Sequence, residues 1–255
     1  MGILNVTPDS FSDGGHFFSL ESATVQGLAL ERDGASIIDI GGESTRPGSV
    51  SIAADVEKDR VLPVICELKK KVSIPLSIDT TKASVAAEAL CAGASILNDI
   101  SGLTADPEMQ AVVAHYKPTV VLMHRKGTPA TMKGMSSKVS EIFNDLKEKA
   151  HLALSLGLNK EQIILDPGIG FGKTIADNWD ILRNLGVLRQ LGFPLLIGAS
   201  RKSFLGDLVG GEPYERDVAT LGVTAWCHNN SVEYVRVHNV RMTNQFLRTL
   251  ERMHE

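Results

Sequence analysis

Carboxylate, amide and cationic side chains recur in this sequence where its short apolar runs end. Such positions hold Asn5, Asp79, Asn98, Asp166 and Arg236. Bringing several buried polar groups together costs free energy unless other polar groups meet them. If the apolar runs are parallel strands, these side chains converge at one edge, and the sequence predicts a ligand site there rather than a purely structural network.

Basic residues gather after the last two apolar runs. Arg201 and Lys202 stand in "GASRKSF", and Arg236 and His238 stand in "RVHN". In α/β barrels the loops after strands seven and eight most often hold a phosphate, and the free N–H groups at the start of the helix in "ASRKSF" favour an anion. Arg46, in "GGESTRPG", adds a further guanidinium. We therefore expect an anionic, phosphorylated substrate.

The acidic side of the predicted site indicates a second part of the substrate. A carboxylate such as Asp166 pairs with a planar N–C–NH2 edge, and the amide of Asn98 offers both a donor and an acceptor. A flat nitrogen heterocycle that carries a phosphate fits both sides. His124 ends another apolar run and either faces the ligand or caps its loop. "GIGFGKT" approaches a phosphate-binding P-loop, but Pro167 occupies the first glycine position that this motif requires.

The elements that would carry these residues alternate along the chain. Near-continuous apolar runs typical of buried parallel strands occupy residues 2–6, 36–40, 74–78, 95–99, 119–123, 163–166, 195–198 and 234–237. Helical patterns occupy residues 21–34, 53–72, 83–93, 107–116, 138–157, 176–192, 215–230 and 240–253. This alternation predicts an α/β fold, a (β/α)8 TIM barrel that forms a single domain over residues 1–255. A doubly wound open sheet is the alternative, because periodicity does not reveal closure.

The two kinds of linker differ in character. Linkers from helix to strand are short and plain ("DGA", "SIP", "AGA", "GFP"), whereas those from strand to helix are long and polar. In a barrel the second kind forms the face where active sites lie. The first of them, "NVTPDSFSDGG", is long and rich in Gly and polar residues, which is typical of a lid that closes over a site.

Bulk composition excludes several partner classes. The 255 residues include 26 Lys and Arg against 30 Asp and Glu, a formal net charge of -4, so no overall basic field would attract nucleic acid or an anionic membrane. No apolar run is long enough to span a bilayer. The cysteines Cys66, Cys91 and Cys227 form no metal-binding or redox spacing, and we expect them to be buried free thiols in a reducing cytoplasm.

The motifs on successive strand ends resemble, in order, those of the dihydropteroate synthases, a family of pterin-binding barrel enzymes. The resemblance covers essentially the whole chain and rests on "MGILNVTPDSFSDGG", "GGESTRPG", "SIDTTK", "LNDISG", "MHRKGTP", "LDPGIGFGKT", "GASRKSF" and "RVHNV". It implies the condensation of (7,8-dihydropterin-6-yl)methyl diphosphate with p-aminobenzoate in folate biosynthesis, with Mg2+ as cofactor. It also implies a homodimer, and the net charge gives no reason to expect nucleic acid or a membrane as a partner.

The resemblance also implies roles for individual residues. The pterin would contact Asp79, Asn98, Asp166 and Lys202; the diphosphate would contact Asn5, Arg46, Arg236 and His238; and the p-aminobenzoate would lie among Phe11, Thr45, Pro47, Phe171, Lys202 and Ser203. Asn5 would bind Mg2+, and the catalytic residues would be Asp9, Asp13, Arg46, Lys202 and Arg236. The chain departs from the family pattern at Asn239, where Asp is common.

Two alternatives from other classes remain at this point. A methyltransferase that uses methyltetrahydrofolate would share the pterin-binding Asp and Asn residues but would not need the aminobenzoate loop or the Arg and His anion site. A non-catalytic pterin-binding or scaffold protein would be favoured by the loss of Asn5, Arg46 or Lys202, and all three are present.

Overall fold

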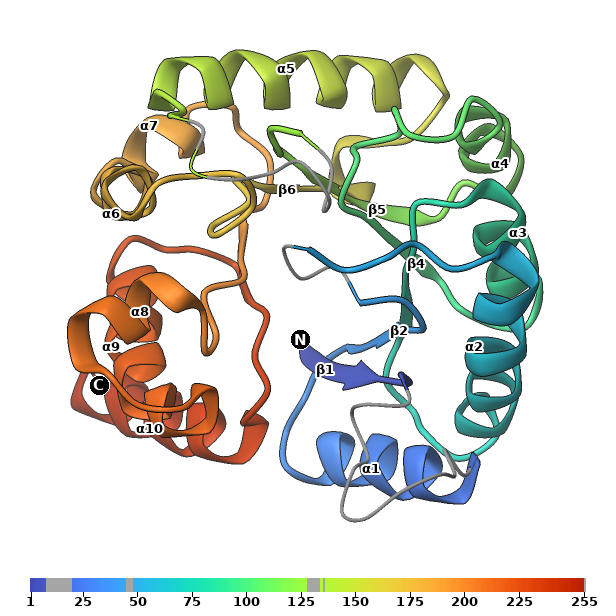
Figure 1. The fold of residues 1–255 in the computed structure, drawn as a ribbon, viewed down its shortest axis with the longest axis horizontal. Helices are drawn as coiled ribbons and strands as arrows, with labels where there is room; N and C mark the ends of the chain where they lie inside the picture. Colours follow the sequence, from blue (N-terminus) through green and yellow to red (C-terminus); the bar gives the residue numbers. More distant parts are fainter. Residues whose placement is uncertain (8–19, 45–47, 128–133, 135, 255) are drawn as a thin grey trace.

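The computed structural model describes residues 1–7, 20–44, 48–127, 134 and 136–254, and it places eight strands inside a ring of helices (Figure 1). The strands are β1 (Gly2–Asn5), β2 (Ile38–Gly41), β3 (Leu76–Asp79), β4 (Ile96–Asp99), β5 (Thr119–Met123), β6 (Ile163–Asp166), β7 (Leu196–Ile197) and β8 (Tyr234–Val235). Each falls within, or one residue beyond, an apolar run of the sequence. The eight predicted strands are therefore confirmed.

The strands close into a barrel through two narrow junctions. Strands β1 to β6 form one parallel sheet and β7 pairs in parallel with β8. Parallel bridges join Leu165 to Leu195 and Gly2 to Val237. At the second junction the N–H of Ile3 donates to Val237 O at 3.0 Å. The predicted (β/α)8 barrel is confirmed, and the open-sheet alternative is wrong.

Helices cover the outside of the barrel. They are α1 (Leu20–Arg32), α2 (Ala54–Lys69), α3 (Ala83–Cys91), α4 (Met109–Tyr116), α5 (Val139–Ser155), α6 (Ile175–Arg183), α7 (Leu185–Arg189), α8 (Ser203–Val209), α9 (Asp217–Asn229) and α10 (Val240–His254), with 3-10 turns η2 (Lys160–Gln162) and η3 (Pro213–Arg216). The single helix expected over residues 176–192 is broken at Asn184. Its side-chain amide donates to Asp180 O at 2.8 Å and so competes with the helical backbone.

Apolar side chains fill two separate volumes. The larger cluster lies between the strands and the surrounding helices. The smaller one fills the inside of the barrel and consists of Met1, Ile37, Ile96, Val121, Ile164 and Leu196, with Tyr234 against it. Each residue comes from a different strand or from the position just before it, and together they fill the interior in the way that barrels require. The packed interior makes the barrel a rigid support for the polar residues at its carboxyl end.

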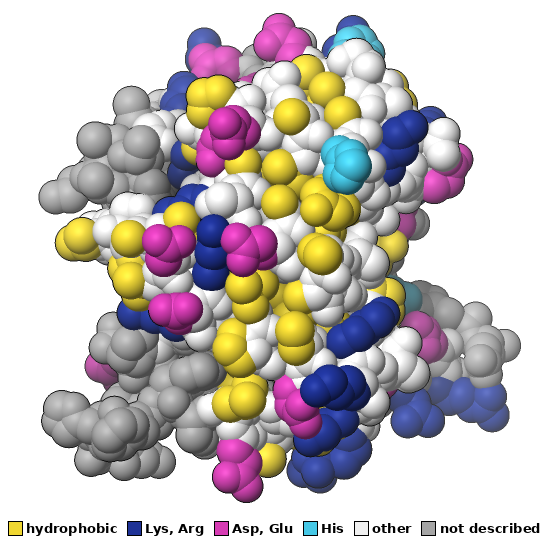
Figure 2. All heavy atoms as spheres, turned by 90° about the vertical axis from the view of Figure 1, so that its right-hand side faces the viewer, with side chains coloured by type: hydrophobic (Ala, Val, Ile, Leu, Met, Phe, Trp, Pro, Cys, Tyr) yellow, Lys and Arg dark blue, Asp and Glu magenta, His cyan; other side chains and the backbone are white. Residues whose placement is uncertain are grey.

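The outer surface corrects one expectation about the cysteines. Cys227 is buried, and burial raises the pKa of its thiol to about 12, but Cys66 and Cys91 are exposed. Each lies on the outward side of an amphipathic helix, which buries only one face. Figure 2 shows the face made by α2, α3 and α4, with apolar side chains down its middle and both acidic and basic ones beside them. Within the described residues, no helix is long and apolar enough to cross a membrane.

Candidate active site

The polar strand ends of the first four strands meet in one row at the carboxyl end of the barrel. The sheet register pairs Asn5 with Gly41, Gly41 with Asp79, and Asp79 with Asn98. Gly41 leaves the middle of this row open, because a Cβ there would lie 3.7 Å from Asp79 Oδ2 and 3.9 Å from Asn5 Oδ1. The amide of Asn5 and the carboxylate of Asp79 therefore border the same open space.

A charged network crosses the barrel beneath this row. Arg236 follows β8 and donates from Nε to Asp39 Oδ2 at 2.6 Å and from Nη2 to Asp79 Oδ2 at 2.8 Å. Asn98 donates from Nδ2 to the same Asp39 oxygen at 3.0 Å. One guanidinium thus links the two carboxylates, and one carboxylate oxygen receives both the guanidinium and the amide.

Asp79 has an unusual environment for a carboxylate. Its side chain is buried, and its Oδ1 atom has no hydrogen-bond partner among the described residues. Burial raises the pKa of Asp79 to about 7, against the opposing effect of the Arg236 cation and with the help of the Asp39 carboxylate. An unpaired buried oxygen at a strand end is a place where a ligand donor would be strongly favoured.

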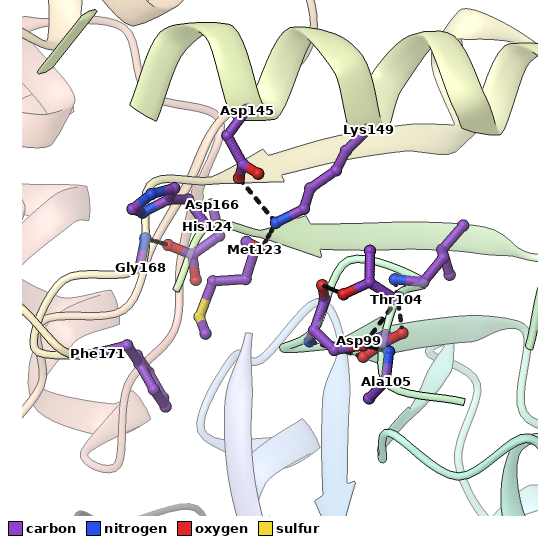
Figure 3. A network of polar contacts seen from close by, with 12 residues as sticks. Asp99, Thr104, Ala105, Met123, His124, Asp145, Lys149, Asp166, Gly168 and Phe171 are labelled. Carbon is purple, nitrogen blue, oxygen red and sulfur yellow. Dashed lines mark hydrogen bonds and ion pairs between the residues drawn. The ribbon is translucent and has the colours of Figure 1, made fainter. Parts of the chain in front are cut away.

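Asp166 and Lys202 form a second pair on the opposite side of the mouth. Asp166 Oδ1 accepts the backbone N–H of Gly168 at 2.7 Å (Figure 3), and burial raises the pKa of Asp166 against the effect of Lys202. Burial also lowers the pKa of Lys202 to about 8. A Cβ at Gly198 would lie 3.9 Å from Lys202 Nζ and 4.0 Å from Asp166 Oδ2. The ammonium and the carboxylate therefore face one small space.

Lys202 also contacts the loop that follows β6. Its ammonium donates to Ile169 O and lies 4.4 Å from the centre of the Phe171 ring, a distance at which the cation is attracted to the aromatic face. These contacts hold the Lys202 side chain against the wall of the mouth. They also place an aromatic surface next to the cation.

His238 is oriented by Ser200. The Ser200 hydroxyl accepts the backbone N–H of His238 at 3.2 Å and lies 2.9 Å from His238 Nδ1. Because the hydroxyl already accepts one hydrogen, it satisfies both contacts best by donating its own hydrogen to Nδ1. This arrangement leaves the hydrogen of a neutral imidazole on Nε2, where it can be donated to an anion.

A buried lysine fixes the loop after β6. Lys173 donates to three backbone oxygens, those of Gly168 at 2.8 Å, His124 at 3.1 Å and Phe171 at 3.2 Å. Burial lowers the pKa of Lys173 to about 7. The loop that carries Ile169 and Phe171 is thereby tied to the end of β5.

His124 has a structural position. Burial and the nearby Lys173 cation lower the pKa of its imidazole to about 3, and Nδ1 has no partner among the described residues. Its backbone N–H donates to Asp166 O at 2.9 Å, and its backbone O accepts Lys173. The backbone of His124 therefore supports the loop, and the role of its imidazole stays a prediction.

An ion cluster anchors the loop after β2. Lys82 contacts Glu43 and lies 2.5 Å from Glu57 Oε2, whose side chain is almost fully buried. Glu43 Oε2 also accepts the backbone N–H of Ile52 at 3.2 Å and the hydroxyl of Ser51 at 3.3 Å. These contacts tie Glu43, which follows β2 closely, to residues 51 and 52, which precede α2.

The structure separates Arg201 from the neighbouring cations. Its guanidinium forms a two-point ion pair with Asp217, at 2.7 Å from Nε and 2.8 Å from Nη2. Asn239, the position that departs from the family pattern, donates to the same carboxylate at 2.8 Å. Arg201 therefore stabilises the start of α9, whereas Lys202 faces the mouth.

Several predicted site residues cannot be placed in this geometry. Asp9, Phe11, Asp13, Thr45, Arg46 and Pro47 lie outside the described residues. Ser203 begins α8 and is exposed. The structure brings together the remaining predicted residues, which are Asn5, Asp79, Asn98, Asp166, Phe171, Lys202, Arg236 and His238.

Sequence reasoning missed three supporting groups. Asp39 lies inside a strand rather than at its end, and a lone carboxylate in the apolar run "IIDIGG" is the feature that would have revealed it. Lys173 belongs to "GIGFGKT", which lacks the first glycine of a P-loop, and nothing else in the sequence points to a role for this lysine. The Glu57 and Lys82 pair joins residues 25 positions apart, and neither position is distinctive alone.

The mouth can therefore bind two kinds of chemical group at once. Asp79, Asn98 and Asp166 offer acceptors and an amide to the edge of a nitrogen heterocycle, while Lys202, Arg236 and His238 offer cations and a donor to an anion. The two sets border one another, so a single molecule could span both.

Comparisons with known proteins agree with this chemistry. Residues 1–238 match the family model described as "Pterin binding enzyme". The dihydropteroate synthase of Synechocystis sp. is 46% identical over 255 residues, which cover 98% of this chain and 88% of the relative.

Solved structures are similar over nearly the whole chain. A Xanthomonas albilineans dihydropteroate synthase with 4-aminobenzoic acid is 39% identical and has a TM-score of 0.93, covering 99% of this chain and 92% of the other. A structure of the enzyme from the same organism in complex with 7,8-dihydropteroate is 36% identical and has a TM-score of 0.89, with the same coverage of both chains.

Proposed function

This chain belongs to the dihydropteroate synthase family of pterin-binding enzymes, and from that membership we propose how its residues bind the substrates and carry out the reaction. The chain condenses (7,8-dihydropterin-6-yl)methyl diphosphate with p-aminobenzoate. The products are 7,8-dihydropteroate and pyrophosphate, and the step belongs to folate biosynthesis. The reaction is a transfer in which a C–N bond replaces a C–O bond.

The pterin is assigned to Asp79, Asn98, Asp166 and Lys202. The aminopyrimidinone ring presents adjacent N–H groups on one edge, and the unpaired Oδ1 of buried Asp79 is an acceptor in the right place for such donors. The Asp166 carboxylate is likewise proposed to accept from ring N–H groups, and the Lys202 ammonium is proposed to donate to acceptor atoms of the ring. This proposal is supported by the open spaces that Gly41 and Gly198 leave beside these side chains.

The diphosphate is assigned to Asn5, Arg46, Arg236 and His238. Arg236 supplies a cation at the end of β8, and Ser200 contacts Nδ1 of His238, two residues further along the chain. A cation and a neutral donor next to the pterin site match a diphosphate one methylene away from the ring. Arg46, in the loop after β2, is the fourth residue assigned to the diphosphate and would add a second guanidinium.

Magnesium is proposed as the cofactor, with Asn5 as its protein ligand. Mg2+ commonly takes one or two protein oxygens together with waters and substrate phosphates, so a single amide oxygen at a strand end fits. When bound, the ion would neutralise charge on the departing diphosphate.

The p-aminobenzoate is assigned to Phe11, Thr45, Pro47, Phe171, Lys202 and Ser203. Phe171 offers an aromatic wall, and Lys202 lies against its ring. The exposed Ser203 at the start of α8 faces the carboxylate in this proposal. The other three residues belong to the loops after β1 and β2.

The proposed chemistry begins with cleavage of the bond between the methylene carbon and the diphosphate oxygen. The dihydropterin ring stabilises the cationic methylene, while Arg46 and Arg236 balance the charge on the leaving group. The neutral arylamine then attacks the carbon and afterwards loses a proton. An arylamine needs no strong base at neutral pH. Asp9 and Asp13 stay in the proposed catalytic set, and the loop after β1 that carries them is proposed to help exclude water from the cation.

One observation carries the proposal: heterocycle-binding and anion-binding side chains converge on one mouth. The test is pyrophosphate release by the purified protein with Mg2+ and the pterin diphosphate, with and without p-aminobenzoate. Release that depends on the arylamine and yields 7,8-dihydropteroate is expected. Pterin binding without any release would instead favour the non-catalytic alternative.

Asn5→Ala tests the metal assignment. Loss of the amide oxygen should raise the Mg2+ concentration for half-maximal activity by roughly tenfold or more, because one of few protein ligands is gone. The measurement is initial rate against free Mg2+. An unchanged Mg2+ requirement would remove Asn5 from the metal site.

A homodimer in the cytoplasm completes the proposal. Large apolar side chains are exposed along α8, η3 and α9, namely Leu208, Val209, Tyr214, Val218 and Trp226, and apolar area of this kind on one side favours self-association. Sedimentation of the wild type and of Val218→Glu compares their oligomeric states, and dissociation into monomers is expected for the variant.

The proposed cytoplasmic location has a separate basis. Three free cysteines are consistent with a reducing compartment.

A further inference from the structure

Asp39 is the most deeply placed charged residue beneath the mouth. It lies in the middle of β2, its side chain is fully buried, and it points into the barrel, above the apolar cluster that fills the interior. A carboxylate in this position is costly unless it is paired and hydrogen-bonded. Its contacts therefore indicate what the charge is used for.

The first contact fixes the orientation of the Asn98 amide. Asn98 Nδ2 lies 3.0 Å from Asp39 Oδ2. Since a carboxylate only accepts, the NH2 group must point down to Asp39 and the amide oxygen must point away from it. Asp39 thus sets Asn98 as an acceptor toward the mouth.

The second contact fixes the plane of the Arg236 guanidinium. Nε donates to Asp39 Oδ2 at 2.6 Å, and Nη2 donates to Asp79 Oδ2 at 2.8 Å. Nη1 makes no hydrogen bond within the described part of the chain. Because Nε and Nη2 of the planar guanidinium are held by the two carboxylates, Nη1 is the nitrogen available to an anion.

We propose that Asp39 is a positioning residue that orients the pterin-binding amide of Asn98 and the diphosphate-binding guanidinium of Arg236 through one shared carboxylate oxygen. The inference rests on the proposed assignment of those two residues to the two parts of the substrate. Asp39 itself contacts neither part. It links the two subsites, so a change at this residue alters both.

Two substitutions separate the charge from the shape. Asp39→Leu keeps the branched shape at a somewhat larger volume and removes every acceptor. Asp39→Asn keeps one acceptor oxygen but removes the charge and places an unpaired NH2 group in the barrel. Ser77→Ala is the matched control, because Ser77 is the register partner of Asp39 on β3, is equally buried, and has a hydroxyl without a partner among the described residues.

The experiment measures binding of two separate probes by calorimetry in Mg2+ buffer, 6-hydroxymethylpterin for the pterin subsite and inorganic pyrophosphate for the anion subsite. Thermal unfolding of each variant reports folding. Asp39→Leu should weaken binding of each probe by roughly a hundredfold, and Asp39→Asn by about tenfold, since hydrogen bonds to charged groups are lost. Ser77→Ala should bind both within about twofold of the wild type.

The outcomes distinguish this inference from the proposed function. If the wild type binds both probes and the folded Asp39 variants bind them equally well, Asp39 has only a structural role and the inference is wrong. Weakening of one probe alone would overturn the link between the subsites. A wild type that binds neither probe would overturn the site assignment and the inference with it.

A measurement on the wild type covers the case in which Asp39→Leu does not fold. In protein labelled with 15N at arginine, the Arg236 Nε–H should exchange slowly with solvent, and it should stay protected when pyrophosphate saturates the site, because Asp39 holds it throughout. Rapid exchange in the presence of pyrophosphate would overturn the inference.

Discussion

Two neighbouring cations in this protein show how position decides what a charge does. Arg201 and Lys202 are adjacent in the sequence, yet Arg201 pairs with Asp217 at the start of α9 and Lys202 lies against Phe171 beside Asp166. Arg201 holds a left-handed backbone conformation, with φ of 61°, which turns successive side chains in different directions. One residue stabilises the fold and the next faces the mouth.

Lys202→Ala should lower kcat/KM for the pterin diphosphate by roughly a hundredfold, because a half-buried charge-assisted donor is lost. Arg201→Ala is the matched control and should lower the melting temperature while leaving KM for the pterin diphosphate close to that of the wild type. Steady-state kinetics and thermal unfolding of both variants check this. An equal loss of catalysis in both would mean that the two cations act as one site.

At this scale the sequence indicates the site but not its supports. Asp79, Asn98 and Asp166 stand out because polar residues at the ends of apolar runs are unusual. The partners of Arg201 and Arg236 could not be predicted, because Asp217 and Asp39 reach them only through the folded chain, the second across 197 positions. Burial, which raises the pKa of Asp79, is likewise a property of the fold.

At the scale of elements, the loop after β6 depends on one internal cation. Lys173 bonds three backbone oxygens, and the loop in turn supplies Ile169 O and the Phe171 ring to Lys202. The loop has no strand or helix of its own to fix its shape. Lys173 therefore contributes to the order of the loop, together with the Asp166 and Asn178 side chains that accept the backbone N–H groups of Gly168 and Gly170.

Lys173→Met should lower kcat/KM for p-aminobenzoate by about tenfold or more, because Phe171 loses its fixed position when the buried carbonyls lose their donor. Lys149→Met is the control, since Lys149 is also buried but bonds Met123 O and Asp145 rather than the loop (Figure 3). It should affect unfolding more than kinetics. Equal kinetic losses in the two variants would contradict the role of Lys173.

Element positions were largely predictable, and the failures have local causes. All eight strands were found because buried parallel strands are apolar throughout. The break at Asn184 was missed because a helical pattern of apolar residues continues across it. The exposure of Cys66 was missed because residue type was given more weight than helix face.

At the scale of the whole molecule, the active site should reduce stability at neutral pH. The pKa of Asp79 is about 7 in the folded protein against 3.8 for the ordinary side chain. The folded state therefore binds more protons than the unfolded state between these values, and Asp79 costs stability progressively as pH rises from about 4 to about 7.

Asp79→Asn removes this titration. From pH 4 to pH 7 the wild type should lose stability relative to the variant by on the order of 1 kcal/mol or more. Urea unfolding of both proteins across this range measures the difference. Two pH profiles that run parallel would show that the pKa of Asp79 is the same in the folded and unfolded states, and would contradict this prediction.

The closure of the barrel has a mechanical consequence. The barrel wall consists of a six-stranded sheet, β1 to β6, and a two-stranded sheet, β7 and β8. One isolated bridge joins the sheets at each of the two junctions, Leu165 with Leu195 and Gly2 with Val237. The acidic and amide residues of the site belong to the six-stranded sheet, namely Asp79, Asn98 and Asp166. The cationic and imidazole residues follow the strands of the two-stranded sheet, namely Lys202, Arg236 and His238. Arg236 already links the two sheets through its ion pairs with Asp39 and Asp79. A bound substrate that contacts both sets of residues would link the two sheets further. The backbone amides of Ile3, Leu165 and Val237 donate hydrogen bonds across the junctions. We expect these amide hydrogens to exchange more slowly with solvent when the site is filled, because the ligand would then stabilise the closed barrel at the points where few backbone hydrogen bonds join it.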